Sequence, residues 1–321
     1  MVHLIGSIDQ TNQVNEADYL EGGVTMRVSD HQLFGTTAGS LARIKDSIVR
    51  VHEQIASQQR ITKPSDDPSI FGQAILEKSA LADNEQWIRN IQFGTARVTV
   101  ADKVLGEAQN LITRVRELTV QARSDTTSAQ GRVTIAQEVR QLHRQLIQLA
   151  NTEVSGQPVF AGTKTDAAPF VLGVGDAVSY QGNSESQSIA VGPNQTTQIV
   201  LPGDQVFTGG ATNIFDGLSN LLVALEGNNG AGIEVAIGAL DQATAQIGLA
   251  QGQIGAIENR LETAQGTAAV VSEAIQKVLS DQTSTDLATA LTELKLQETA
   301  YEATSQTFSR LFDLSLLKFL R

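Results

Sequence analysis

Proline, the residue that most strongly breaks helices, is confined to two short parts of this 321-residue chain. Two prolines stand at positions 64 and 68, and the other four lie at positions 158, 169, 193 and 202. The long stretches 69–157 and 203–321 contain none. Because a proline removes a backbone donor and clashes with the preceding helical turn, its absence allows long, uninterrupted helices in both stretches.

Apolar residues in the helical stretches recur at alternating spacings of three and four, which is typical of coiled-coil seams. The longest set runs without interruption from Ala243 to Val278, and a shorter set predicts a further helix after Gly131. Two seams of the same kind lie near the chain ends. They consist of Leu41, Ile44, Ile48, Val51 and Ile55, and of Leu287, Leu291, Leu294, Tyr301 and Phe308. We therefore predict that helices from opposite ends of the chain pair with each other.

The segment 153–232 differs in composition from the helical stretches. Proline and glycine are concentrated there, and short β-prone runs at 177–180, 187–191 and 196–201 alternate with turn signals. We predict a small β-rich subdomain at 153–232, inserted into a mainly α chain.

The breaks in the apolar pattern suggest how the helices are organised. One break surrounds the prolines at 64 and 68, and the other is rich in Ser, Thr and Asp at 280–286. We predict terminal helices at 26–63 and 285–321, and a helical bundle formed by 64–152 and 233–284. The predicted fold is a long antiparallel coiled-coil or helical-bundle rod, built from both chain ends, that carries the β-rich insert.

Composition argues against several classes of function. A net charge of −12 disfavours nucleic acid as a partner, and the chain has no stretch as apolar as a membrane span. The absence of Cys removes thiolate nucleophiles and sulfur metal sites. The four histidines, at positions 3, 31, 52 and 143, form no pair with the spacing of a zinc site. We predict no catalytic, cofactor-binding or metal-binding residue.

The first 25 residues need a separate explanation. Glu21-Gly22-Gly23 stands shortly before Met26, and a purine-rich ribosome-binding site would encode these residues if it were translated. We therefore predict Met26 as the native start and residues 1–25 as a non-native extension, with a short disordered extension as the alternative. Residues 1–25 lack the basic start and the apolar stretch of a secretory signal peptide.

The stretch between the first two helices contains an acidic pair beside a serine. It consists of Pro64, Ser65, Asp66, Asp67 and Pro68. Neighbouring carboxylates diverge in an extended link, which disfavours the alternative of an acid/base pair. Asp67 is instead placed to cap the next helix, with Pro68 at its first position. We predict that the five residues form a joint between two layers of helices.

The last turns of the chain are more apolar than one partner helix can cover. They include Leu311, Phe312, Leu316 and Leu317. An apolar surface of this extent suggests burial between subunits. We predict that these four residues and the two terminal seams form an assembly surface.

Two motifs at opposite ends of the chain resemble those of one family. The segment 60-RITKPSDDP-68 is similar to the motif that follows the first helix in bacterial flagellins and their hook-associated relatives, and 285–320 resembles the conserved tail of the same family. The resemblance implies a structural protein whose terminal helices pair as an inner coiled-coil layer only when subunits assemble into a tube.

A third segment resembles one branch of that family. In 156-GQPVFAGTKTDAAPF-170, the residues similar to the branch that joins the hook to the filament are Phe160, Gly162, Lys164, Thr165, Pro169 and Phe170. Pro158 departs from the tyrosine usual there. The resemblance implies a homo-oligomeric ring in the extracellular flagellum, exported without a cleaved signal peptide. It also implies contacts with the first hook-associated protein, with flagellin and with an export chaperone.

Two alternatives stay open at this point. The chain could be a flagellin, which builds the filament itself. It could also be a secreted coiled-coil adhesin or an enzyme with an inserted β domain. Specific hydrolase activity, or ligand binding by 153–232, would favour the second alternative.

Overall fold

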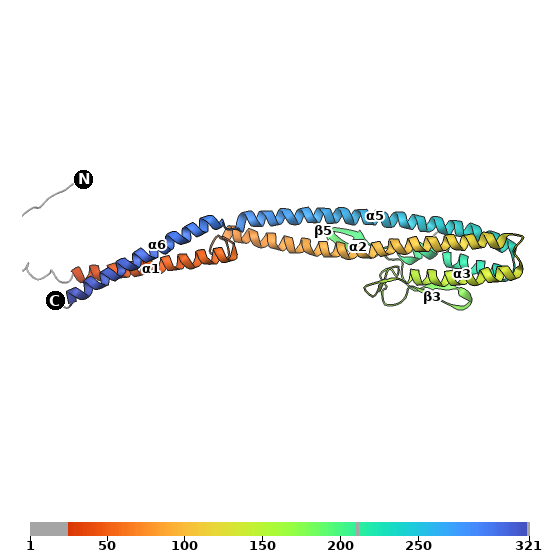
Figure 1. Cartoon of the computed structure of the whole chain (residues 1–321), viewed down its shortest axis with the longest axis horizontal. Coiled ribbons are helices and arrows are strands. Elements are labelled where there is room, and N and C mark those ends of the chain that lie inside the picture. Colours follow the sequence, from red (N-terminus) through yellow and green to blue (C-terminus); the bar gives the residue numbers. More distant parts are fainter. Residues whose placement is uncertain (1–24, 210–211, 320–321) are drawn as a thin grey trace, which may run out of the picture. The chain divides into compact units, whose positions relative to one another are not determined.

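The computed structural model describes residues 25–209 and 212–319, without the side chains of residues 25–31, 33 and 311–319. The predicted extension 1–25 therefore lies almost wholly outside the described residues. So do the side chains of Leu311, Phe312, Leu316 and Leu317. The chain forms two compact units, one built from residues up to Ile75 and from Leu279 onward, the other from Leu76–Val278 (Figure 1).

Unit 1 is built around two helices from opposite ends of the chain. These are α1 (Thr25–Ser57) and α6 (Leu287–Phe319). The ring of Phe34 packs edge-on against that of Phe308 with centroids 5.8 Å apart, while Gln59, just after α1, pairs with Ser284, just before α6. The two helices are therefore antiparallel. This arrangement confirms the predicted mainly α fold made from both chain ends.

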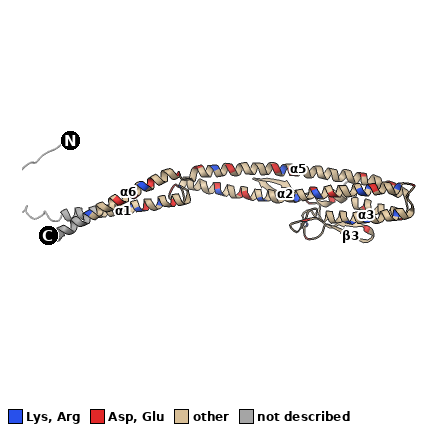
Figure 2. Ribbon diagram, viewed as in Figure 1, with Lys and Arg blue, Asp and Glu red and all other residues tan. Residues whose placement is uncertain are grey.

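Unit 2 is built around two much longer helices, α2 (Pro68–Arg123) and α5 (Gly230–Thr283), most of which lie in this unit. The buried Asn84 amide of α2 donates to the Ala268 carbonyl of α5 over 2.8 Å, and Arg116 of α2 pairs with Asp241 of α5 at 2.6 Å. The contact residue with the higher number on α2 meets the residue with the lower number on α5, so these two helices are also antiparallel. Basic and acidic side chains are interspersed along both (Figure 2).

Two shorter helices add a further layer to unit 2. Helix α3 (Ala129–Ala150) is capped by Ser128, whose hydroxyl accepts from the Gly131 amide, so this predicted helix starts slightly earlier than expected. Helix α4 (Ile214–Glu226) lies within the segment predicted to be β-rich. Asn213 caps α4, and its apolar residues recur at helical spacing. Flanking glycines obscured this short helix in the sequence.

The strands form three separate antiparallel pairs in the middle of the chain. They are β1 (Glu153–Val154) with β2 (Gln157–Pro158), β3 (Phe170–Leu172) with β4 (Val178–Tyr180), and β5 (Ser188–Gly192) with β6 (Gln195–Gln198). One-turn segments η1 (Val174–Asp176) and η2 (Asp204–Thr208) complete the region. The predicted run 196–201 extends past β6, because Ile199, Val200 and Leu201 are buried in irregular backbone. The segment is thus less β-rich than predicted.

An aromatic cluster holds this insert against the helices. Phe170 lies at the centre, with ring centroids 5.1 Å from Tyr180, 5.4 Å from Phe207 and 5.2 Å from Phe215. Phe160 adds an edge-on contact to Phe207 at 5.3 Å. Aromatic pairs of this kind stabilise a core beyond their buried area alone. Burial also raises the pKa of Tyr180 to about 12.

Two basic side chains are buried in this unit. The Arg97 guanidinium of α2 donates to the Pro158 carbonyl at 2.9 Å, and burial lowers its pKa. The His143 imidazole of α3 packs beside Phe215, and neither of its ring nitrogens has a hydrogen-bond partner among the described residues. Burial lowers the pKa of His143 as well, because the charged form would lose its hydration.

None of the helices within the described residues combines the length and apolar character needed to span a bilayer.

Candidate assembly surface

The seam between α1 and α6 is only partly closed. On α1, Val51 is 3% exposed, whereas the other predicted seam residues are half-buried. These are Leu41, Ile44, Ile48 and Ile55. Two helices alone can cover only a narrow stripe of each other. The structure therefore brings the predicted α1 residues to the face that meets α6, without enclosing them.

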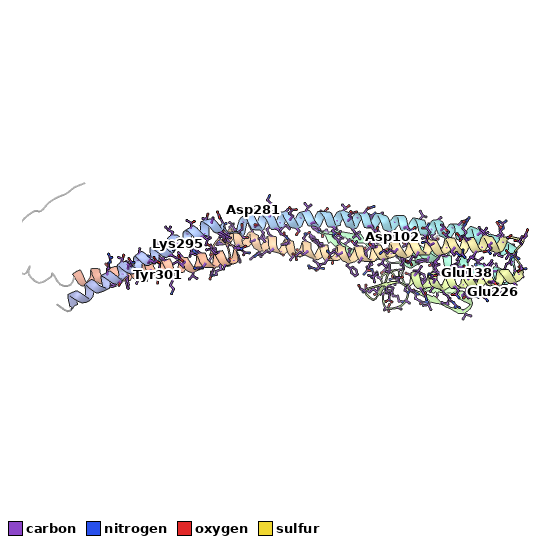
Figure 3. All side chains as sticks on the ribbon, in the orientation of Figure 1. Asp102, Glu138, Glu226, Asp281, Lys295 and Tyr301 are labelled. Carbon is purple, nitrogen blue, oxygen red and sulfur yellow. The ribbon has the colours of Figure 1, made fainter. Side chains whose placement is uncertain are left out.

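The α6 side of the seam is more open. Leu294, Tyr301 and Phe308 are half-buried, while Leu287 and Leu291 are 41% and 54% exposed. Further apolar side chains project outside the seam. They are Val49 on α1, 50% exposed, and Leu296 on α6, 68% exposed. Figure 3 labels Tyr301 and Lys295 along this helix. Such uncovered apolar area on a two-helix unit suits contact with further protein.

Backbone hydrogen bonds join the segment that follows α1 to the segment that precedes α6. The Arg60 amide donates to the Thr283 carbonyl at 2.7 Å, and the Thr285 amide donates to the Gln58 carbonyl at 3.0 Å. The Arg60 guanidinium also donates to the Gln282 carbonyl at 3.1 Å. We call residues 58–60 and 283–285 the clip. It fixes the end of α1 relative to the start of α6.

The clip changes the predicted end of the first helix. The prediction of a helix over 26–63 ended by Pro64 is wrong in this respect, because α1 ends at Ser57. Gln58 has a φ of +56°, which turns the chain out of the helix before any proline is reached. The predicted break at 280–286 is likewise shorter, since α5 continues to Thr283 and α6 begins at Leu287.

The acidic pair serves two different purposes. The Asp67 carboxylate accepts from the amides of Ser69 and Ile70, both at 3.0 Å, which confirms the predicted cap of α2. The Asp66 carboxylate points back and accepts from the Thr62 and Lys63 amides, also at 3.0 Å. These bonds lower the pKa of Asp66. The two carboxylates therefore act apart, and Pro64, Ser65 and Pro68 lie exposed around them.

The segment between α5 and α6 ends in a similar cap, formed by Asp286. The Asp286 carboxylate accepts from the Thr289 hydroxyl at 2.9 Å and from the Ala288 amide at 2.9 Å, at the start of α6. These interactions lower the pKa of Asp286. An aspartate therefore caps the start of α2 and another caps the start of α6.

The six residues that resemble the hook-associated branch hold the insert together. Phe160 and Phe170 are fully buried in the aromatic cluster, and the Pro169 carbonyl accepts from the Gln181 amide at 2.7 Å. Gly162 has a φ of +69°, and a Cβ there would run into Asn183. Lys164 donates to the Gln181 carbonyl at 3.0 Å, and Thr165 is half-buried nearby. The resemblance therefore rests on residues that shape the insert.

The clip is the part of this surface that the sequence did not reveal. Gln59 and Ser284 pair as an isolated β-bridge. Such a bridge requires neither a strand nor an apolar repeat, so the sequence contains no periodic pattern that predicts it. The positive φ of Gln58 could not be predicted either, because glycine and asparagine are the residues that usually adopt this conformation and glutamine is not. In the described part of the chain, no three His, Asp or Glu residues gather as metal ligands would.

Family comparisons agree with this arrangement of the two chain ends. Residues 28–165 match the model of the bacterial flagellin N-terminal helical region, and residues 237–320 match that of the bacterial flagellin C-terminal helical region. Together the two matches cover all of α2 and α6 and most of α1 and α5.

Individual relatives are similar over different shares of their length. The flagellar hook-associated protein 3 of Escherichia coli (strain K12) is 26% identical over 317 residues, which cover 91% of this chain and 99% of that protein. The flagellin of Bacillus subtilis (strain 168) is also 26% identical, but over 258 residues, 74% of this chain and 80% of that protein.

A solved structure supports the fold. A protein described as flagellar hook-associated, from Vibrio parahaemolyticus, superposes with a TM-score of 0.63 at 20% identity, covering 68% of this chain and 100% of its own.

Proposed function

Because the chain belongs to the bacterial flagellin family, we propose that it is a structural protein of the flagellum that joins the hook to the filament. The observation that carries this proposal is the near end-to-end similarity to hook-associated protein 3, set against the shorter match to flagellin. The relatives are structural proteins, and a non-enzymatic role for this chain fits a surface made of apolar seams and helix caps.

Assembly would proceed through unit 1. Its half-closed seam leaves Leu287, Leu291 and Leu296 in water. Full burial of one such side chain contributes roughly 1.5–3 kcal/mol of favourable free energy. Neighbouring copies would supply that burial and so offset the ordering entropy of the terminal helices. The terminal helices would then form the inner layer of the tube, and the joint at residues 64–68 would connect that layer to the next.

The partners follow from the same proposal. Copies of this chain would form a ring, with the first hook-associated protein on the hook side and flagellin on the filament side. An export chaperone would hold the C-terminal helix before assembly. The protein would act outside the cell, after passage through the flagellar export apparatus without a cleaved signal peptide.

Deletion of the gene tests the proposal against its main alternative. Loss of a junction protein should leave hooks intact while flagellin accumulates in the medium, and the wild-type gene should restore filaments. If this chain were itself flagellin, the mutant would release no filament protein. Immunolabelling should place the wild-type protein at the hook-filament boundary, and label along the whole filament would contradict the proposal.

A further inference from the structure

Unit 2 presents an apolar knob that the helical core leaves uncovered. The knob is the β3–β4 hairpin with the residues before it, and its exposed apolar side chains are Ala167, Ala168, Val171, Leu172, Val174 and Ala177. Val174 at the tip is 98% exposed. Apolar side chains gathered in this way at a hairpin tip are characteristic of a contact surface.

The knob is held in one conformation. Asp176 in the turn pairs with Arg140 of α3 at 2.9 Å, and its carbonyl accepts from the Ser219 hydroxyl of α4 at 2.7 Å. The Gly173 amide donates to the Ala177 carbonyl at 2.7 Å across the turn. A surface fixed in this way loses little conformational entropy when it binds.

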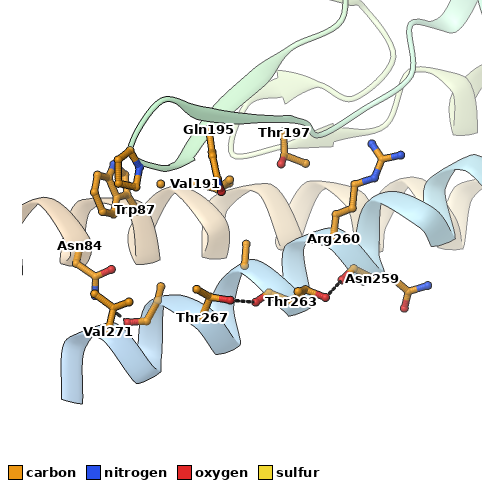
Figure 4. A pocket seen from close by; sticks show the side chains of 14 residues that line it. Asn84, Trp87, Val191, Gln195, Thr197, Asn259, Arg260, Thr263, Thr267 and Val271 are labelled. Atoms are coloured by element: carbon orange, nitrogen blue, oxygen red, sulfur yellow. Dashed lines mark hydrogen bonds between the residues drawn. The ribbon is translucent and has the colours of Figure 1, made fainter. Parts of the chain in front are cut away.

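The same unit also presents an apolar pocket. A cavity of about 530 Å³ lies between α2, α5 and the β5–β6 turn (Figure 4). Its apolar walls are Trp87, Val191, Pro193, Ala264, Ala268 and Val271. Trp87 is the single tryptophan of the sequence, and Figure 4 shows it beneath the β5–β6 turn.

Three of the polar side chains around the pocket donate hydrogen bonds within the chain. The Asn84 amide donates to Ala268, and the hydroxyls of Thr263 and Thr267 donate to carbonyls of their own helix at 2.8 and 3.0 Å. An occupant would therefore meet mainly apolar surface and would need few hydrogen bonds. The pocket suits aliphatic side chains such as those of the knob.

Charge is also complementary between the two surfaces. Arg260 lines the pocket and forms no ion pair with any residue that the structure describes. Asp166 stands next to the exposed Ala167 of the knob and, among those same described residues, is equally without an ionic partner. Opposite charges at the edge of an apolar contact fix its register and disfavour wrong partners.

We propose that the knob of one copy enters the pocket of a neighbouring copy in the assembled ring, an inference that rests on the proposed function. A chain cannot fill its own pocket, because β3 lies beside α3 while β5 lies farther along between α2 and α5 (Figure 1). Contacts between two different surfaces of one chain generate rings or helical arrays, as a hook-filament junction requires.

The absence of Cys from the chain permits a direct test. Val174→Cys and Thr267→Cys are combined in one full-length chain, and flagella are isolated under mild oxidation. A disulfide-linked dimer of this protein should form in the pair and in neither single variant. The matched control combines Val174→Cys with Val235→Cys, which is exposed on α5 and does not line the pocket.

The outcomes separate this inference from the proposed function. The knob-pocket contact is overturned if the Val174/Thr267 double-cysteine variant enters flagella without forming a dimer, or if the control variant forms as much dimer. Either result would leave the junction role intact. Cross-linking of the pocket cysteine to flagellin or to another flagellar protein would overturn it as well. Absence of the wild-type chain from the hook-filament boundary would instead overturn the proposed function.

Charge reversal provides a second test. Asp166→Arg and Arg260→Asp should each reduce the disulfide yield in the Val174/Thr267 cysteine pair, and their combination should restore it. Both positions are exposed, so neither change is expected to unfold the chain. Equal yields in all four backgrounds would contradict the charge pairing.

Discussion

The helix pairs α1–α6 and α2–α5 share one apolar spacing and differ in what covers it. From Ala243 to Leu261, the seam residues of α5 are at most 5% exposed. Along α1 and α6, Val51 is the buried member of the ten seam residues, and the other nine are half-buried or exposed. Unit 2 adds α3, α4 and the hairpins, whereas α1 and α6, within the described residues, pack mainly against each other. The spacing thus determines which face is apolar, and the number of layers determines whether it is buried.

The same contrast occurs within α5 itself. Its seam continues past Leu261, yet Val271 and Val278 are 38% and 40% exposed. Val271 lines the pocket beside the β5–β6 turn, and Ala268, one turn before it, is still only 4% exposed. An unbroken apolar repeat therefore passes from a closed core to an open surface without any change in the sequence pattern.

The largest expected effect lies in the closed core. Ile254→Ala should lower the free energy of unfolding by about 2–5 kcal/mol, because Ile254 is fully buried and the surrounding core cannot collapse around the lost methyl groups. Chemical denaturation of the isolated chain followed by circular dichroism measures this. Leu249→Ala on the same helix, 72% exposed, is the control. Equal losses from both variants would show that burial does not distinguish these positions.

A smaller effect is expected at the joint. Asp67→Ala should cost about 0.5–2 kcal/mol, since two amides at the start of α2 lose their acceptor. Ser65→Ala, an exposed change two residues away, is the control. Hydrogen exchange of the first turn of α2 reports the change locally. Unaltered protection there would mean that Asp67 does not hold the end of this helix.

The buried histidine predicts an acid-dependent effect confined to unit 2. Its folded pKa lies below that of the unfolded chain, so the His143 contribution is fully present above about pH 6.5 and is lost as pH falls from there toward the folded pKa. Arg140 and Arg144 on α3 disfavour the charged imidazole, while Asp176 favours it. His143→Leu should therefore flatten the loss of stability below pH 6.5, measured by thermal unfolding at stepped pH.

The exposed His52 of α1 supplies the control for that measurement. His52→Gln removes a histidine from an exposed position and is measured in the same way. If His52→Gln flattens the pH dependence of stability, or if His143→Leu leaves it unchanged, the buried imidazole is not the cause of the acid-dependent loss of stability.

The smallest effect on the isolated chain is expected in the open seam. Leu291→Asp should change the free energy of unfolding by no more than about 0.5 kcal/mol, because the side chain is already largely in water. Incorporation into flagella should nevertheless fail, since assembly would bury a charge there. Leu291→Met is the control that keeps the apolar surface. Normal motility with Leu291→Asp would exclude this face from assembly.

Local signals in the sequence predicted much of this structure. The spacing of Ala243–Leu261 predicted a buried stripe, and Asp67 before Pro68 predicted a cap, because both depend on residues within a few positions of each other. The clip could not be predicted in this way. Its partners Gln58 and Thr285 meet only after the whole chain has folded back.

Burial of the basic side chains was also beyond the sequence pattern. In the sequence, Arg97 resembles an ordinary surface arginine, but it is buried because the insert covers it. His143 likewise lies on the apolar face of α3, where α4 encloses it. Helix α4 itself was not predicted, so neither was this environment.

The clip also constrains the order in which the molecule can fold. Arg60 meets Gln282 across 222 positions, and Asn84 meets Ala268 across 184. Contacts so distant in sequence form late, because a long loop must close before they are made. A chain that emerges from a narrow channel starting at its N-terminus would present α1 and α2 well before their partners. Under the export route proposed above, the paired helices would therefore form only as the final segment leaves the channel.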